Sequence, residues 1–212
     1  MKNMHDIRTE YSSKPLIAEE MNTNPIIQFT SWLGEVELLG IQDFNAATLS
    51  TYDIHKKKVR SRIILIKEIT KQGVIFFSNY DSDKGKEIWT HPQVAISIYW
   101  PTLFRQVRFE GVVTKTSEAI SDTYFLSRPK ESQISAIVSK QSSVVANKRI
   151  LEERYQRFIN DSSSISRPAN WGGFELVADY WEFWQGRNHR LHDRVCYSKT
   201  ENQTWTKTIL EP

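Results

Sequence analysis

The spacing of hydrophobic residues separates a helical start of the chain from a long β-rich stretch. Residues 1–23 are polar and have no clear period, and we expect them to form a mobile arm. Apolar residues then recur at helical spacing between Ile26 and Val36. Asn24 and Pro25 precede them and suit the cap and the first position of a helix. The pattern therefore predicts a helix that begins at Pro25.

The middle and the end of the chain show patterns typical of β-strands. Alternating residues or runs of β-branched residues, bounded by turn residues, predict strands at 46–52, 61–69, 73–78, 94–100 and 105–116. A short helix at 83–91 interrupts them and is stopped by Pro92. The pattern returns near the C-terminus, with strands expected at 173–177, 180–185, 195–198 and 205–210.

Three segments between these strand groups lack internal Pro and Gly and predict helices. They cover 117–126, 130–138 and 144–158, and a Ser-rich linker follows at 161–170. The order of strands, helices and strands contains no βαβ alternation. We therefore expect an α+β fold that is mainly β. It would be a single barrel domain over 24–212, with helices inserted at about 117–158.

Composition narrows the class of protein. The 212 residues include 28 Lys and Arg against 25 Asp and Glu, a net charge of +3 that argues against a general nucleic-acid binder. The single cysteine, Cys196, excludes an intrachain disulfide. No apolar run reaches the length of a membrane helix, and residues 1–13 do not resemble a secretory signal. We expect a cytoplasmic protein without membrane or nucleic-acid partners.

Two polar features allow more than one interpretation. Alternation places Lys67 at the end of the row formed by Ile63 and Leu65, which we expect to be buried, and a strand-end lysine that reaches solvent is the simpler interpretation. The run from Ser82 to Lys86 precedes a helix, so its basic groups could hold a phosphate together with free N–H groups. Such a run is more often a solvated face.

A third feature combines two hydroxyls with a guanidinium. Tyr124 and Arg128 lie four residues apart on one helical face, and Ser132 follows beyond Pro129. Together they could bind one phosphate monoester, because arginine pairs with phosphate through two parallel hydrogen bonds. An ordinary corner between two helices explains the same residues equally well.

The densest cluster of functional side chains runs from Trp181 to Arg194. A metal site at His189, His192 and Asp193 is opposed by the neighbouring arginine charges, and we expect no metal. A nucleic-acid surface is opposed by the acidic residues that interrupt the cluster. A pocket for a flat, anionic, aromatic ligand explains the mixture better, because Trp packs on rings, Arg pairs with phosphates and His exchanges protons.

This stretch resembles the C-terminal signature of the pyridoxine (pyridoxamine) 5′-phosphate oxidase family, in which Glu-Phe-Trp-Gln precedes Arg-Leu-His-Asp-Arg. Further motifs follow in that family's order from about Arg8 to the end of the chain. They are Arg8–Tyr11, Arg62–Lys67, Asn79-Tyr80 with Lys84–Lys86, Arg105–Val107, Ser127–Pro129 with Ser132-Gln133, Ser139–Ser142 and Trp171–Gly173. So many ordered and spaced motifs make a chance match very improbable.

The resemblance implies an FMN-binding split β-barrel that forms a homodimer with FMN between the subunits. The FMN contacts it implies are Arg62, Ile63, Ile64, Leu65, Ile66, Lys67, Phe77, Ser78, Lys84, Gln106, Gln141, Ser142, Trp184 and Arg194. The substrate contacts it implies are Lys67, Tyr124, Arg128, Ser132, Arg190, Leu191 and His192, with Arg8 and Tyr11 as a cover. Arg190 and His192 are the implied catalytic pair. We expect them on one side of a strand-like stretch.

The implied reaction belongs to vitamin B6 metabolism. It oxidises pyridoxine 5′-phosphate and pyridoxamine 5′-phosphate to pyridoxal 5′-phosphate, with hydride transfer to the flavin and dioxygen as the acceptor that yields hydrogen peroxide. One alternative is a related flavin oxidase that acts on a phenazine precursor, which would not need Tyr124, Arg128 and Ser132 together. Another is a non-catalytic protein that binds FMN or pyridoxal phosphate.

Several positions depart from the family pattern, and Asp83 is the one that brings a charge to the FMN phosphate motif. Asp83 stands where the family usually has Arg before the lysine, which brings a negative charge towards the FMN phosphate. Two interpretations are open. The carboxylate repels the phosphate, or it caps the following helix, whose N-terminus favours a negative side chain.

Overall fold

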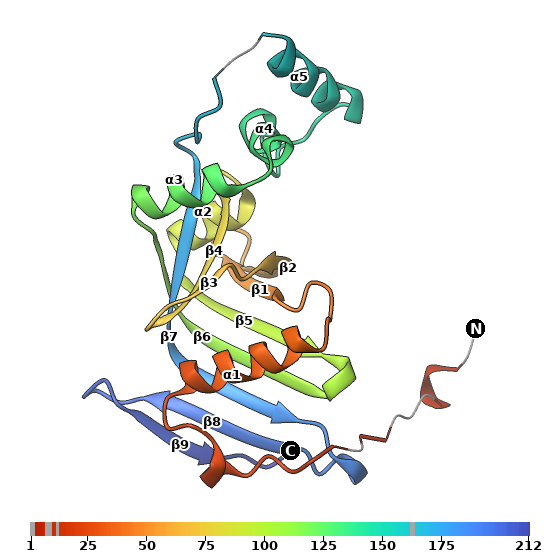
Figure 1. Cartoon of the computed structure of the whole chain (residues 1–212), viewed down its shortest axis with the longest axis vertical. Coiled ribbons are helices and arrows are strands. Elements are labelled where there is room, and N and C mark those ends of the chain that lie inside the picture. Colours follow the sequence, from red (N-terminus) through yellow and green to blue (C-terminus); the bar gives the residue numbers. More distant parts are fainter. Residues whose placement is uncertain (1–2, 7–9, 12, 162–163) are drawn as a thin grey trace.

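The computed structural model describes residues 3–6, 10–11, 13–161 and 164–212. In this part of the chain nine strands form one antiparallel sheet in the order β2-β1-β5-β6-β7-β4-β3, and β8 and β9 continue from β7 (Figure 1). The strands are β1 (Ala46–Asp53), β2 (Lys58–Leu65), β3 (Glu68–Ile69), β4 (Gly73–Asn79), β5 (Gln93–Trp100), β6 (Arg105–Lys115), β7 (Trp171–Gln185), β8 (Asp193–Lys199) and β9 (Trp205–Ile209).

The helices lie close to their expected places. They are α1 (Pro25–Leu38), α2 (Asp83–Thr90), α3 (Glu118–Ser127), α4 (Lys130–Val138) and α5 (Lys148–Asn160). The Asn24 side chain accepts a hydrogen bond from the N–H of Ile26 and caps α1, as the sequence predicts. The helix expected from residue 144 begins only at Lys148, because Asn147 caps it there. None of the helices in the described ranges has both the length and the apolar character that crossing a membrane requires.

The chain between β2 and β3 joins two parts of the sheet. The N–H of Ile66 donates to the carbonyl of Asn45, just before β1, and the N–H of Lys67 donates to Ile75 in β4. The expected single strand over 61–69 was therefore wrong. The chain leaves β2 after Leu65 and crosses to β4, and these two hydrogen bonds hold the crossing segment. Lys67 lies at this crossing.

Aromatic side chains fill the core beside α1. The Phe29 ring lies 5.6 Å from Phe109 and 5.3 Å from Trp181, and Trp32 meets Phe183 edge-on at 5.2 Å. All five side chains are buried. The apolar face of α1 predicted by helical spacing thus covers the strands β6 and β7 (Figure 1).

Strand β7 is the longest element and connects two ends of the molecule (Figure 1). The two strands expected at 173–177 and 180–185 are one strand, and the break in the pattern at Asp179 corresponds to a register shift against β6. The first half of β7 pairs with β4, while its second half pairs with β8. The two halves of β7 therefore lie in different regions of the molecule.

One face of the edge strand β2 is exposed. The row that contains Ile63 and Leu65 was expected to be buried, but Ile63 is 65% exposed and Leu65 is 38% exposed. Ile64 and Ile66, on the opposite face, are buried. The expectation was wrong for a single chain, because nothing in its described part covers this face. Exposed apolar side chains on an edge strand are typical of an interaction surface.

Candidate active site

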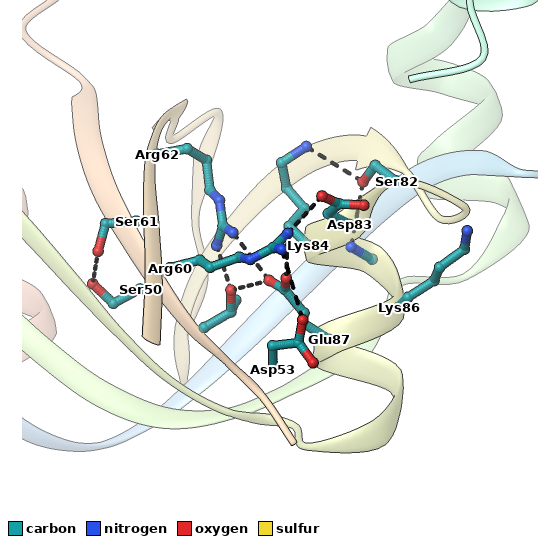
Figure 2. A network of polar contacts seen from close by, with 12 residues as sticks. Ser50, Asp53, Arg60, Ser61, Arg62, Ser82, Asp83, Lys84, Lys86 and Glu87 are labelled. Atoms are coloured by element: carbon teal, nitrogen blue, oxygen red, sulfur yellow. Dashed lines mark hydrogen bonds and ion pairs between the residues drawn. The ribbon is translucent and has the colours of Figure 1, made fainter. Parts of the chain in front are cut away.

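Two groups of expected site residues gather at opposite halves of β7. The first group surrounds the N-terminus of α2 and includes Arg62, Ser78 and Lys84, which we call the cation cluster. Figure 2 shows Arg62 and Lys84 of this cluster. Lys84 is 9% exposed. Its Nζ lies 3.0 Å from Ser78 Oγ and 3.4 Å from Ser82 Oγ. Among the described residues no carboxylate lies within 4 Å of this ammonium, so the buried cation is free to pair with an anion.

The electrostatics of Lys84 agree with this geometry. Burial lowers the pKa of Lys84 and the neighbouring Arg62 guanidinium lowers it further, while the charges of Asp83 and Glu87 oppose this in part. A bound anion would relieve both effects, because it favours the charged form of the amine. The free N–H groups at the start of α2 add to the attraction. The cation cluster therefore fits a phosphate group.

Asp83 does not cap α2. The cap is Ser82, whose Oγ accepts from the N–H of Gly85 and which is fully buried in the turn before the helix. Asp83 occupies the first helical position, and its carboxylate pairs with Arg60 at 2.6 Å. The capping interpretation was wrong because serine, one residue earlier, already satisfies the helix N–H group.

Gln141 extends the cation cluster. Its Oε1 accepts from Ser78 Oγ at 3.3 Å and from the N–H of Asn79 at 3.4 Å. Ser142 follows with a left-handed backbone, at a φ of 69°. The segment between α4 and α5 thus lies beside the end of β4, as the sequence motifs imply for a shared cofactor site.

An aromatic stack lies next to the cluster. The rings of Phe77 and Tyr124 are 3.9 Å apart and nearly parallel, and the Trp171 ring lies near both, at 5.7 Å from Phe77 and 6.2 Å from Tyr124. Phe77 and Tyr124 line a cavity of about 370 Å³ together with Lys67 and Ser127.

Arg128 also contacts Trp171. Its guanidinium carbon is 4.7 Å from the Trp171 ring, and its buried Nη1 has no hydrogen-bond partner among the described residues. Burial lowers the pKa of this arginine. Arg128 borders a second cavity of about 460 Å³, and Ser132 lies in the first turn of α4 beyond it. Tyr124 and Arg128 therefore share Trp171 as a neighbour but line different cavities.

The second group lies at the far end of β7. The His192 ring packs 4.7 Å from Trp184 and 5.6 Å from Tyr11, so the arm residue Tyr11 covers this end. His192 Nδ1 accepts the backbone N–H of Arg187 at 3.0 Å, which leaves Nε2 to carry the proton in the neutral ring. Gln106 pairs with Trp184 across the strands. Arg8, the other expected cover residue, lies outside the described residues.

Arg190 and His192 do not lie on a strand, contrary to expectation. Asn188–Arg190 forms a tight turn, and His189 and Arg190 have φ values of 56° and 63°. Left-handed backbone at consecutive non-glycine residues is strained and is concentrated at functional sites. The turn leaves Arg190 and Leu191 exposed beside His192.

Arg194 is oriented by a buried carboxylate. Its Nε and Nη2 donate to Glu182 at 3.1 and 3.0 Å, and Arg108 donates to the same carboxylate at 3.1 Å. Burial alone would raise the pKa of Glu182, but the hydrogen bonds from Arg194 and Arg108 outweigh it and lower the pKa. Glu182 was not among the expected site residues.

The sequence analysis also missed residues around the cation cluster. Arg62 Nη2 lies 3.0 Å from Glu87, and Thr51 donates to the same carboxylate at 2.5 Å. Arg60 pairs with Asp83 in this network. A signal existed for Arg60, because alternation along β2 places it on the same face as Arg62. In the described ranges no three His, Cys, Asp or Glu side chains are grouped to hold a metal ion.

Comparison with known proteins matches two parts of the chain to known sequence families. Residues 35–160 match the sequence model of the pyridoxamine 5′-phosphate oxidase family, and residues 171–212 match the pyridoxine 5′-phosphate oxidase C-terminal dimerisation region. Two solved structures share the fold. PhzG from Burkholderia lata, in complex with tetrahydrophenazine-1-carboxylic acid, has a TM-score of 0.88 and 24% identity over 95% of this chain and 100% of its own. A pyridoxamine 5′-phosphate oxidase-related, FMN-binding protein from Nostoc punctiforme has a TM-score of 0.73 and 14% identity over 91% of this chain and 100% of its own.

Curated relatives are similar over the whole chain. The pyridoxine/pyridoxamine 5′-phosphate oxidase of Haemophilus ducreyi is 42% identical over 99% of this chain and 100% of its own length. That of Nostoc sp. is 39% identical over 100% and 99%. The chloroplastic pyridoxine/pyridoxamine 5′-phosphate oxidase 1 of Arabidopsis thaliana is 42% identical over 97% of this chain, which spans 40% of that longer protein. The chain therefore belongs to the pyridoxamine 5′-phosphate oxidase family.

Proposed function

We propose that the protein oxidises pyridoxine 5′-phosphate and pyridoxamine 5′-phosphate to pyridoxal 5′-phosphate with FMN as cofactor. The observation that carries the proposal is the buried Lys84 ammonium, which has Arg62 and Ser78 beside it and no carboxylate within ion-pair distance in the described chain. Such a site fits the FMN phosphate, and the full-length curated relatives support the reaction. A homodimer, dioxygen as acceptor and a cytoplasmic location are parts of the same proposal.

Bound FMN would supply the two-electron acceptor for a hydride from the exocyclic carbon of the substrate, with dioxygen as the final acceptor and hydrogen peroxide as its product. The chain contributes binding and orientation. Arg62, Ser78 and Lys84 would hold the cofactor phosphate, and Arg128, whose buried Nη1 has no hydrogen-bond partner in the described chain, would bind the substrate phosphate. His192, with its proton on Nε2, would donate a hydrogen bond from that atom at the reacting end of the substrate.

We place FMN between two subunits. Gly173, beside Phe77 in the register, and Trp184 lie eleven residues apart on β7, which corresponds to about 36 Å of extended strand. One flavin nucleotide is too short to contact both groups in a single chain. A second subunit that brings its Trp184 end to the cation cluster of the first would complete the site. The exposed Ile63 and Leu65 and the dimerisation region support this arrangement.

The test uses the purified protein in air. A flavin absorbance band, followed by formation of pyridoxal 5′-phosphate and hydrogen peroxide on addition of pyridoxine 5′-phosphate, is the expected result. A flavin band without peroxide would indicate a non-catalytic FMN-binding protein. Turnover of a phenazine precursor but not of pyridoxine 5′-phosphate would contradict the proposed substrate.

Arg128 is expected to bind the substrate phosphate. Arg128→Ala removes a charge-assisted hydrogen bond and should raise KM, at a cost of about 1.5–3 kcal/mol, with FMN content near normal. Steady-state kinetics and flavin absorbance measure both quantities. Lys130→Ala, which removes an exposed charge two residues away, is the control and should leave KM unchanged. Loss of FMN with an unchanged KM would overturn the assignment of Arg128.

A further inference from the structure

Four charged side chains form a network beside the cation cluster: Arg60, Asp53, Asp83 and Glu87. We propose that Arg60 is a positioning residue of the FMN phosphate site, because it neutralises Asp83 and so preserves the positive potential of Arg62 and Lys84. The inference rests on the proposed function. It concerns a residue of β2 whose role is set by the acidic residue at the start of α2.

The Arg60 guanidinium contacts three carboxylates (Figure 2). Its Nη1 lies 2.6 Å from Asp83 Oδ2 and 3.3 Å from Glu87 Oε1, and its Nη2 lies 3.8 Å from Asp53 Oδ2. Glu87 is only 5% exposed, and its Oε1 accepts no well-aligned hydrogen bond. The nearby Arg60 guanidinium is therefore the main group that offsets the negative charge of this buried oxygen. Arg60 thus binds the acidic groups that surround the phosphate site.

Arg60 is the cation that balances Asp83. Asp53 also has Lys56 at 3.7 Å and Glu87 also has Arg62 at 3.0 Å, whereas Asp83 pairs with Arg60 in the described part of the chain. Figure 2 shows the acidic side chains grouped around Arg60, while Lys84 contacts only hydroxyls. Without Arg60 the Asp83 carboxylate would lose this partner and leave an unpaired negative charge close to a phosphate that is itself anionic. The electrostatic cost would fall on FMN binding.

The geometry also fixes where Asp83 points. Asp83 is at the first position of α2, next in sequence to Lys84. The ion pair with Arg60 holds its carboxylate towards β2, and the helix N-terminus favours its negative charge there. Arg62 keeps its own partner, Glu87, at 3.0 Å. Arg60 therefore acts through Asp83 and not as a direct contact of the cofactor.

A double-mutant cycle at Arg60 and Asp83 separates this role from a structural one. Apoprotein of each variant is titrated with FMN, and quenching of flavin fluorescence gives Kd at low and at high ionic strength. We expect Arg60→Met to weaken FMN binding by about tenfold at low salt, since Asp83 is half exposed and its field is partly screened. The loss should shrink at high salt, because the Debye length falls from about 30 Å at 0.01 M to about 3 Å at 1 M.

The Asp83→Asn substitution, alone and combined with Arg60→Met, provides the decisive measurement. Asp83→Asn alone should leave FMN affinity unchanged or improve it, and Arg60→Met with Asp83→Asn should restore Kd to near the wild-type value. Melting temperatures of all variants report folding. Arg149→Met removes an exposed arginine that pairs with Glu153 on α5 and controls for net charge.

Two outcomes overturn the proposal. One is an unchanged Kd in Arg60→Met, and the other is a double variant that binds FMN as weakly as Arg60→Met, which would mean that Arg60 serves only the fold. Failure of the wild-type apoprotein to bind FMN would instead refute the proposed function. The two failures are therefore distinguishable.

Discussion

Substitution of His192 by Asn, or of Arg190 by Met, should lower kcat/KM by about 100-fold or more, in the range that a general acid–base group contributes. His192 is fixed between Trp184 and Tyr11 and accepts the N–H of Arg187, so its free nitrogen has a defined direction. Arg190 is held beside it by a strained turn. FMN content and the melting temperature should stay near those of the wild type.

The control is a neighbour in the same turn. His189 is exposed and has a φ of 56°, a conformation that asparagine tolerates well, so His189→Asn should keep normal turnover. Steady-state kinetics on FMN-saturated protein compare the three variants. Normal kcat/KM in both His192→Asn and Arg190→Met would remove these residues from the catalytic mechanism.

The same pair predicts a pH effect. Burial lowers the pKa of His192, the positive charge of Arg190 lowers it further, and Asp193 opposes this in part. The ring therefore stays neutral to lower pH than an ordinary histidine. Arg190→Met removes one of the lowering effects, so the pKa should rise. If neutral His192 is the reactive form, the acid limb of the kcat/KM profile should move to higher pH in that variant.

Local patterns predicted most of the fold because local physics determines those elements. The alternation in residues 105–116 became β6, with Val107, Phe109 and Val113 buried. Asn24 and Pro25 set the start of α1 as predicted. Cys196 lies buried in β8, as expected for a strand residue. The family motifs added the barrel, whose pairing order no local pattern contains.

The features that the sequence analysis predicted wrongly or overlooked depend mainly on contacts between distant residues. The break after Leu65 follows from hydrogen bonds to Asn45 and Ile75, which no local period encodes. The turn at His189 and Arg190 requires left-handed backbone at residues that rarely adopt it, so a strand was the natural expectation. Arg60 and Asp83 are 23 residues apart, and only the folded sheet brings them together.

The division of the site between subunits can be tested by mixing two impaired chains. Arg128→Ala affects the group near Trp171, and His192→Asn affects the group near Trp184, at opposite ends of β7. In a heterodimer with a shared site, one site receives both substitutions and the other receives neither. We expect such a heterodimer to regain about half of the wild-type activity per dimer, from its one intact site.

Two affinity tags allow the heterodimer to be purified after the subunits are mixed, and kcat/KM at low substrate is compared with both parent homodimers. Each homodimer carries its substitution in both sites and should stay impaired, which makes the parents matched controls. If each chain formed its own complete site, every site in the heterodimer would carry one substitution and no activity would return. An active wild-type monomer near 24.8 kDa in solution would contradict the shared site independently.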